Sequence, residues 1–160
     1  MLSQLTPVCP QPLLNQAQAL PAMVTAVVNA GSELALESAK LAFEAGIIVP
    51  ILVGNIAAIQ KAAQAIDWNI DQFELIASES EEDSAANAVQ CVHQGTAKLL
   101  MKGNLHTDVL IRALLNKEHG LRTGERLSHL FHMSVPGSDC LLYISPSQRD
   151  QRGSRMPSSA

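Results

Sequence analysis

The chain has 160 residues, which is enough for a single domain with a substantial core. Its formal net charge of -4 argues against nucleic acid as a partner, and its 47% hydrophobic content excludes an intrinsically disordered chain. Cys9, Cys91 and Cys140 have the spacing of neither a disulfide framework nor a zinc site, so we expect a reducing compartment and no bound metal. No segment has the pattern of a signal peptide or the length of an apolar membrane span, so we expect a cytoplasmic protein without a membrane partner.

From Met23 onward, apolar runs typical of buried strands alternate with amphipathic helical segments. The predicted strands cover residues 23–28, 47–53, 73–76, 97–101, 127–133 and 140–144. The predicted helices run from Ser32 to Gly46, from Ile56 to Ile66, from Ser80 to His93 and from Thr107 to Leu115. Residues 1–18 precede this pattern as a lead-in with one or two helical turns.

Strands separated by helices indicate βαβ units, and a chain with only 3% aromatic residues favours the aliphatic packing of α/β layers. We therefore predict an α/β fold over residues 19–145, with an open, mostly parallel sheet and helices on both faces. Pro50 has no backbone N–H, so we expect its strand near a sheet edge or with an irregularity. The short loop from Ser134 to Asp139 predicts that the last two strands are antiparallel neighbours.

The turn after the fourth predicted strand carries the strongest chemical pattern in the chain. Lys102 and Gly103 end that strand, and we expect Gly103 to supply the φ freedom that the turn needs. Thr107 and Asp108 are the expected caps of the following helix. A helix N-terminus beside Lys102, with Arg112 farther along the helix, is suited to bind an anion. The pattern predicts a phosphate-type ligand here, although the same residues are also typical of a helix start that binds nothing.

Several separated segments resemble the phosphate acetyltransferase/phosphate butyryltransferase family, in the same order: residues 19–28, 45–54, 100–115 and Leu127-Ser128-His129. The resemblance implies reversible transfer of an acyl group between coenzyme A and inorganic phosphate, with coenzyme A as a substrate and no bound cofactor. It also implies a fold like that of isocitrate and isopropylmalate dehydrogenases, of which this chain would form the first part of two domains. Acyl phosphate, acyl-CoA and phosphate are the implied partners, and a homo-oligomer is the implied assembly.

The resemblance further implies a phosphate site at the same turn. Gly103, Thr107 and Arg112 match the family's glycine turn, hydroxyl and helix arginine, which face the phosphoryl group. Lys102 and Ser128 occupy matching positions of the motif. A dianionic ligand needs cations, a hydroxyl and exposed N–H groups in one place, which agrees with this set. The candidate phosphate-binding residues are Lys102, Gly103, Asn104, His106, Thr107, Arg112 and Ser128, and no catalytic residue is assigned.

Two features depart from the family. Its members are longer, and the residues that polarise the carbonyl and activate coenzyme A have no counterpart here. Residues 146–160 change abruptly to a Ser- and Arg-containing composition, so we hypothesise an out-of-frame tail on a truncated acyltransferase; a genuine short paralogue is the other interpretation. The alternative function is a non-catalytic remnant that binds a phosphate-bearing ligand or a partner chain. A general nucleotide-binding domain is disfavoured because no GxGxxG follows a strand.

Other polar residues have a structural interpretation beside a functional one. His106 either contacts phosphate or only starts the helix. His129 and His132 point to opposite faces of a predicted strand, so they cannot bind one metal together. Cys91 fits a buried, unreactive thiol. The acidic group near residue 80 fits a solvated helix start better than a metal site, and it consists of Glu79, Glu81, Glu82 and Asp83.

Overall fold

The computed structural model describes residues 10–123, 131–134 and 141–144. The chain divides into two units, one formed by residues 15–123 and the other by residues 1–14 with 124–160. The predicted domain limits at residues 19 and 145 stay predictions. None of the helices in the described residues is long and apolar enough to cross a membrane.

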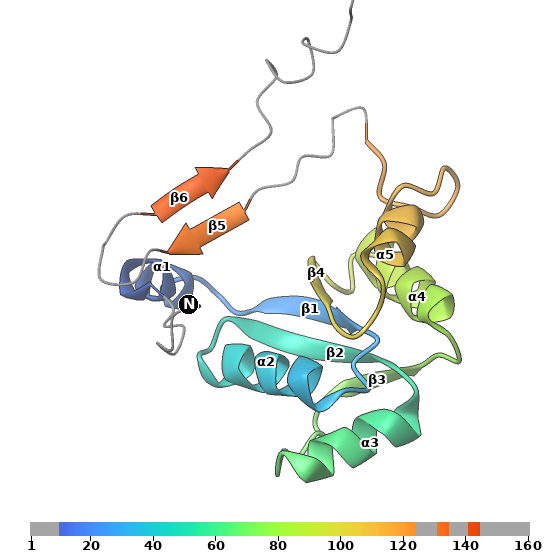
Figure 1. The fold of residues 1–160 in the computed structure, drawn as a ribbon, viewed down its shortest axis with the longest axis horizontal. Coiled ribbons are helices and arrows are strands. Elements are labelled where there is room, and N and C mark those ends of the chain that lie inside the picture. Colours follow the sequence, from blue (N-terminus) through green and yellow to red (C-terminus); the bar gives the residue numbers. More distant parts are fainter. Residues whose placement is uncertain (1–9, 124–130, 135–140, 145–160) are drawn as a thin grey trace, which may run out of the picture. The chain divides into compact units, whose positions relative to one another are not determined.

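Short helices and strands alternate through the first part of the chain, as Figure 1 shows. In chain order they are α1 (Gln11–Gln18), β1 (Met23–Val28), α2 (Glu33–Glu44), β2 (Ile48–Gly54), α3 (Ile56–Ala65), β3 (Glu74–Ala77), α4 (Glu81–His93), β4 (Leu99–Lys102) and α5 (Thr107–Leu114). Each of α2, α3 and α4 begins after a polar N-cap whose side chain accepts a backbone N–H of the first turn; these caps are Ser32, Asn55 and Ser80. Gly46, predicted to follow the end of α2, has a φ of 72° there.

The four strands form one parallel sheet in the order β3-β2-β1-β4. β1 lies in the interior of the sheet, where Thr25 pairs with Pro50 of β2 on one side and with Leu99 of β4 on the other. The chain thus builds outward from β1 through β2 to β3 and then returns to the opposite side of β1 for β4. This order confirms the predicted open parallel sheet and is typical of a doubly wound fold.

The strand that contains Pro50, β2, lies next to the edge strand β3, in agreement with the prediction of a position near an edge. The Ile47 carbonyl faces β1, where it accepts the Met23 N–H at 2.9 Å. Successive residues of a strand face opposite neighbours, so the backbone of Pro50 faces β3. β3 pairs with β2 only from Ile51, opposite Glu74, onward. The missing N–H of Pro50 therefore falls just before that pairing begins.

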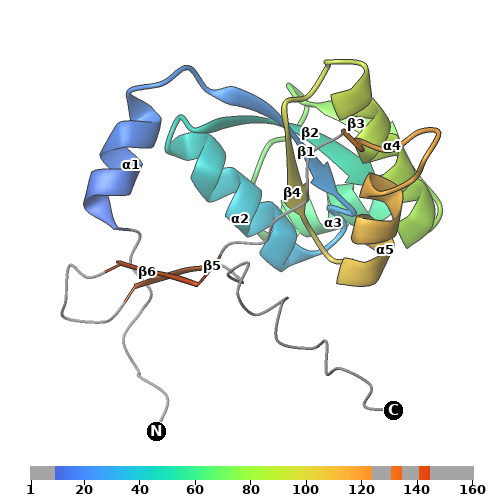
Figure 2. The same cartoon turned by 90° about the horizontal axis from the view of Figure 1, so that it is seen from above.

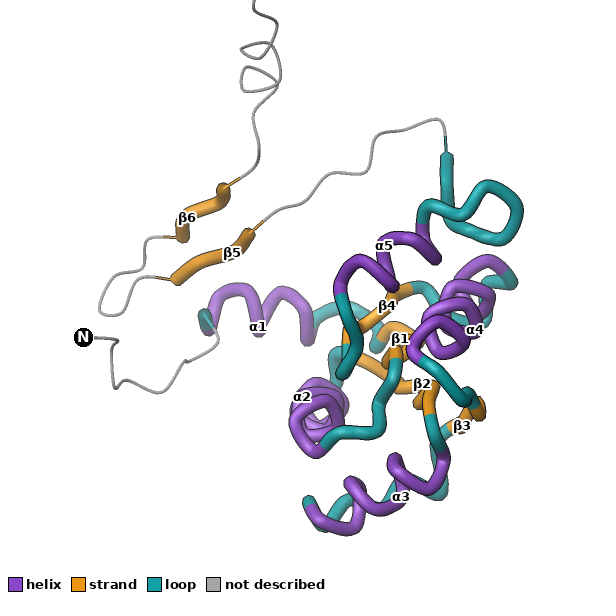
Figure 3. The backbone as a smooth tube through the Cα atoms, turned by 45° about the vertical axis from the view of Figure 1, so that its right-hand side comes forward, coloured by secondary structure: helices purple, strands orange, loops and turns teal. Residues whose placement is uncertain are grey.

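Helices cover both faces of the sheet, as predicted. Figure 3 shows α2 and α3 on one side and α4 on the other, and Figure 2 shows α5 beside α4. On the α2/α3 face, fully buried Leu36, Leu52 and Ile59 pack together. On the α4/α5 face, Val53 packs with small and branched side chains such as Ala88. Each such branched side chain contributes about 1.5–3 kcal/mol by leaving water.

The smaller unit contains β5 (Phe131–Ser134) and β6 (Leu141–Ile144). They pair antiparallel, with Phe131 opposite Ile144, which confirms the predicted pairing of the last two strands. Ser128, a candidate phosphate ligand, and His129 lie outside the described residues.

Candidate functional site

The reversal of strand order places the ends of β1 and β4 side by side. Val28, the last residue of β1, pairs with Lys102, the last residue of β4. β1 leads to α2 on one face of the sheet, whereas β4 leads to α5 on the other. Open α/β sheets bind their ligands beyond the carboxyl ends of the strands at this kind of switch point. The β4–α5 turn (residues 103–106) lies at that position.

Gly103 is needed for space rather than for φ freedom. The prediction of a special φ is wrong, because the positive-φ glycines of the described residues are Gly46, Gly54 and Gly95. A Cβ atom on Gly103 would instead lie 2.4 Å from the Val28 carbonyl oxygen and 2.7 Å from that of Asn29. The Gly103 N–H donates to the Val28 carbonyl at 2.9 Å, which holds the turn this close to β1. Glycine lets the two backbones approach each other.

Asn29 is a positioning residue that the sequence analysis missed. Its backbone has a φ of 52°, a left-handed conformation that asparagine tolerates better than most residues. Its carbonyl accepts the Asn104 N–H at 3.1 Å, and its side-chain amide donates to the Asn104 carbonyl. Asn29 therefore fixes the β4–α5 turn from the end of β1. An asparagine directly after a β-branched run was the available signal.

The N-terminus of α5 differs from its prediction. Thr107 and Asp108 do not cap the helix; they are its first two residues, and His106 is the N-cap, without a side-chain cap hydrogen bond. The His106 backbone N–H and ring Nδ1 both bond to Oε2 of Glu81, at 2.8 and 2.9 Å. The first N–H groups inside α5 have no acceptor within the helix, as in any α-helix. They are the amides that this site can offer to an anion, since those of Gly103 and Asn104 are bound to β1.

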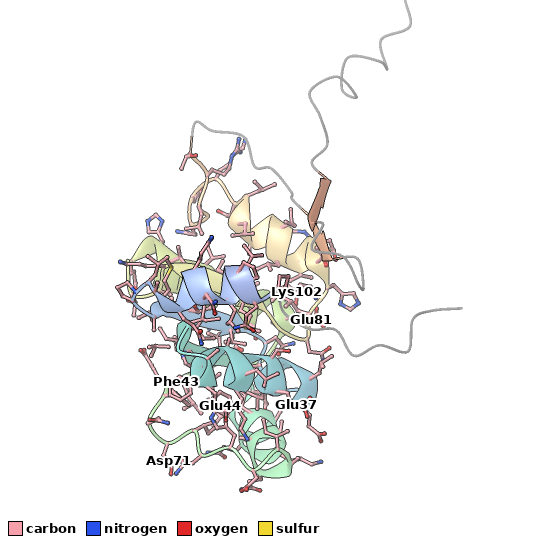
Figure 4. The ribbon with its side chains drawn as sticks, turned by 90° about the vertical axis from the view of Figure 1, so that its left-hand side faces the viewer. Glu37, Phe43, Glu44, Asp71, Glu81 and Lys102 are labelled. Carbon is pink, nitrogen blue, oxygen red and sulfur yellow. The ribbon has the colours of Figure 1, made fainter. Side chains whose placement is uncertain are left out.

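Glu81 and His106 shift each other's protonation. Hydrogen bonds from the His106 backbone and ring lower the pKa of the Glu81 carboxyl, with a smaller contribution from the charge of Lys102. The Glu81 carboxylate raises the pKa of His106, and Asp108 adds to this effect while Lys102 opposes it. Figure 4 shows Glu81 and Lys102 near one another. Glu81, Glu82 and Asp83 lie in the first turn of α4, as predicted for an acidic helix start, and Glu81 in addition binds His106.

Arg112 and Lys102 supply the cationic charge. The Arg112 guanidinium bonds to Asp108 at 3.1 Å, and the two side chains are 72% and 69% exposed. An exposed ion pair of this kind contributes little, so the guanidinium can turn to another anion at small cost. The Lys102 ammonium donates to the Gly103 carbonyl at 3.4 Å. Lys102, Gly103, Asn104 and His106 thus lie on one short turn that contacts with β1, Asn29 and Glu81 hold in place, and Arg112 is paired with Asp108 in the first turn of α5.

A hollow elsewhere along the same edge of the sheet suits an anion less well. It has a volume of about 450 Å³ and lies at the ends of β2 and β3, between Asn55 and Ser78. Glu79 and Asp83 also line it, and their negative charges oppose phosphate. Within the described ranges, no three His, Cys, Asp or Glu side chains come close enough to hold a metal ion.

No family model matches the chain. The phosphate acetyltransferase of Rhizobium meliloti is 38% identical over 133 residues, which cover 83% of this chain and 42% of that protein. The phosphate butyryltransferase of Clostridium beijerinckii is 36% identical over 133 residues, which cover 83% of this chain and 44% of that protein. The chain belongs to the phosphate acetyltransferase/phosphate butyryltransferase family. This membership confirms the resemblance drawn from the sequence.

Solved structures of the phosphotransacylase type share the fold of this family member. The EutD phosphotransacetylase of Staphylococcus aureus superposes with a TM-score of 0.58 at 18% identity, covering 83% of this chain and 49% of that one. A branched-chain phosphotransacylase of Enterococcus faecalis gives 0.56 at 20% identity, covering 77% and 42%. The chain spans less than half the length of the relatives it matches. The predicted likeness to isocitrate and isopropylmalate dehydrogenases stays a prediction.

Proposed function

We propose that this chain supplies the phosphate-binding part of an acyltransferase that moves an acyl group between coenzyme A and inorganic phosphate. The observation that carries the proposal is the β4–α5 turn, which hydrogen bonds to β1 hold at the switch point of the sheet. The activities after which the relatives are named, phosphate acetyltransferase and phosphate butyryltransferase, support the same chemistry. Coenzyme A acts as a substrate in this proposal, and no bound cofactor is needed.

Each phosphate-binding group has a defined part in the reaction. The coenzyme A thiolate attacks the acyl carbonyl, the bond between that carbon and the phosphate oxygen breaks, and phosphate leaves with an added negative charge. Lys102 and Arg112 stabilise that charge, and the Thr107 hydroxyl and the first N–H groups of α5 donate hydrogen bonds to the phosphate oxygens. Ser128 remains part of the proposed set. The base for the thiol and the donors for the carbonyl oxygen are not assigned.

The cellular setting and assembly belong to the proposal as well. We place the protein in the cytoplasm and expect a homo-oligomer, because large apolar side chains are exposed on α2. Leu34 and Leu41 on α2 are 74% and 67% exposed, which agrees with an uncovered surface. Light scattering across a concentration series tests this expectation, and a monodisperse monomer at high concentration argues against it.

The activity is tested by coenzyme A-dependent release of phosphate from acetyl phosphate and butyryl phosphate. Replacing Arg112 with Gln removes a cation that faces the leaving phosphate, so we expect kcat/KM to fall about a hundredfold. Arg122→Gln is the matched control, because Arg122 is an exposed arginine beyond α5 and should leave the rate unchanged. Equal rates in the two variants would contradict the assignment of Arg112.

A further inference from the structure

We propose that Glu81 is a positioning residue of the phosphate site, holding the His106 ring so that its other nitrogen, Nε2, binds phosphate only when the ring is protonated. This inference rests on the proposed function, because it assigns a further ligand to the same site. Glu81 belongs to α4, whereas His106 starts α5, so the contact joins segments 25 residues apart in the chain.

One oxygen of the Glu81 carboxylate holds both the backbone and the ring of His106. One carboxylate oxygen of Glu81 accepts the His106 backbone N–H at 2.8 Å and faces the ring Nδ1 at 2.9 Å. A carboxylate can only accept, so Nδ1 carries a proton whenever Glu81 is ionised. The neutral ring then has a lone pair at Nε2, and the protonated ring has an N–H donor there. The His106 side chain is 80% exposed, which leaves Nε2 accessible to a ligand.

The charges around the turn make phosphate binding depend on whether His106 is protonated. Lys102 and Arg112 are balanced by Glu81, which lies beside His106, and by Asp108, which is paired with Arg112. With a neutral His106 ring these groups therefore carry no net formal charge, whereas the imidazolium makes the group positive. A phosphate dianion is attracted more strongly in the second state, which adds both a charge and an Nε2–H donor.

The same contacts determine how binding depends on pH. Glu81 and Asp108 favour the imidazolium and Lys102 opposes it, and the net result is a raised pKa of His106. The imidazolium therefore persists to a higher pH than in an unpaired histidine. The affinity for the phosphate dianion should be highest below the folded pKa of His106 and should fall several-fold as pH rises through it. Removing the Glu81 charge should shift this fall to lower pH.

The test uses NMR on the whole ¹³C,¹⁵N-labelled chain. The pKa and tautomer of His106 are measured first without phosphate, in the unmodified protein, in Glu81→Gln and in Glu82→Gln. Glu82 is the next residue of α4 and is exposed, so its variant removes the same charge on the same helix turn. Inorganic phosphate is then titrated at several pH values, and its dissociation constant is taken from the amide shifts of residues 102–109.

We expect Glu81→Gln to lower the pKa of His106, to reduce the Nδ1-protonated tautomer and to move the loss of phosphate affinity to lower pH, while Glu82→Gln changes none of these. His106→Gln, a second variant that keeps Glu81, should weaken phosphate binding at low pH and remove the part of its pH dependence that follows the titration of His106. Equal His106 pKa values in the two glutamate variants would overturn the positioning role. An unchanged phosphate affinity in His106→Gln would overturn the ligand role.

If the proposed function is wrong, the phosphate titration gives a different result. Phosphate would then shift no amide of the β4–α5 turn in the unmodified protein at any pH. The Glu81 dependence of the His106 pKa is measured without phosphate, so it would still be observed. The pattern of shifts thus separates a wrong positioning role from a wrong binding site.

Discussion

Replacing Gly103 with alanine tests the contact that holds the site together. The added Cβ would lie 2.4 Å from the Val28 carbonyl oxygen and 2.7 Å from the Asn29 carbonyl oxygen. Both obstacles are backbone atoms at the end of a strand in the interior of the sheet, so neither can rotate away as a side chain would. The β4–α5 turn must therefore move away from β1.

The structure gives the size of the effect. Overpacking against rigid neighbours costs about 1–3 kcal/mol. Moving the turn also stretches the hydrogen bonds from Gly103 and Asn104 to β1, at 2.9 and 3.1 Å, and each contributes about 1 kcal/mol. We therefore expect Gly103→Ala to lower the free energy of unfolding by about 3–5 kcal/mol, a large part of the 5–15 kcal/mol of an ordinary domain.

The fluorescence of Trp68 allows the free energy of unfolding to be measured directly. Trp68 is the single tryptophan of the chain, only 9% exposed, and it packs on Phe73 with ring centroids 5.3 Å apart. Its fluorescence should follow unfolding in urea, and circular dichroism of the helices should give the same midpoint if the transition is two-state.

Gly95→Ala is the control that separates crowding from backbone strain. Gly95 has a φ of 80°, but a Cβ there would meet no atom within 4 Å. Alanine at this position should lower the free energy of unfolding only through its left-handed backbone conformation, by about 1–2 kcal/mol. If Gly103→Ala is no less stable than Gly95→Ala, the close approach of β1 and the β4–α5 turn does not require glycine, and the reasoning is refuted.

Three further predictions concern the core and the ion pair. Leu52→Ala, at a fully buried position, should lower the free energy of unfolding in urea by about 2–5 kcal/mol, whereas Leu41→Ala, at a 67% exposed position, should change it by less than about 0.5 kcal/mol. Burial raises the pKa of the Cys91 thiol, so peptide mapping after brief maleimide treatment at neutral pH should find it unlabelled until urea unfolds the protein. The pKa of Glu81 is lowered and that of His106 is raised, so their mutual stabilisation is lost as pH falls through the first and as pH rises through the second. Glu81→Gln should therefore lower the urea midpoint most between those two pH values, and less above the pKa of His106, where only hydrogen bonds to Glu81 remain; an equal loss at all pH values would contradict the ion pair.

Local sequence patterns located the elements well. The run of β-branched residues predicted β1 at residues 23–28, where the structure has it, and Ser32 caps α2 as expected. These features depend on neighbours in the chain, because periodicity and capping act within a few residues. The point at which β3 begins decides how the sheet accommodates Pro50, and no local pattern encodes it.

The candidate site was only partly predictable for the same reason. The sequence by itself determined an α/β chain with a Lys-Gly turn before a helix, and it carried the family resemblance that the comparisons confirmed. Only the tertiary structure decided the order β3-β2-β1-β4, which sets that turn against Asn29 at the end of β1. It also joined Glu81 to His106, two residues on different helices. Such contacts depend on the path of the chain around the sheet, and residues far apart in sequence leave no periodic trace of their meeting.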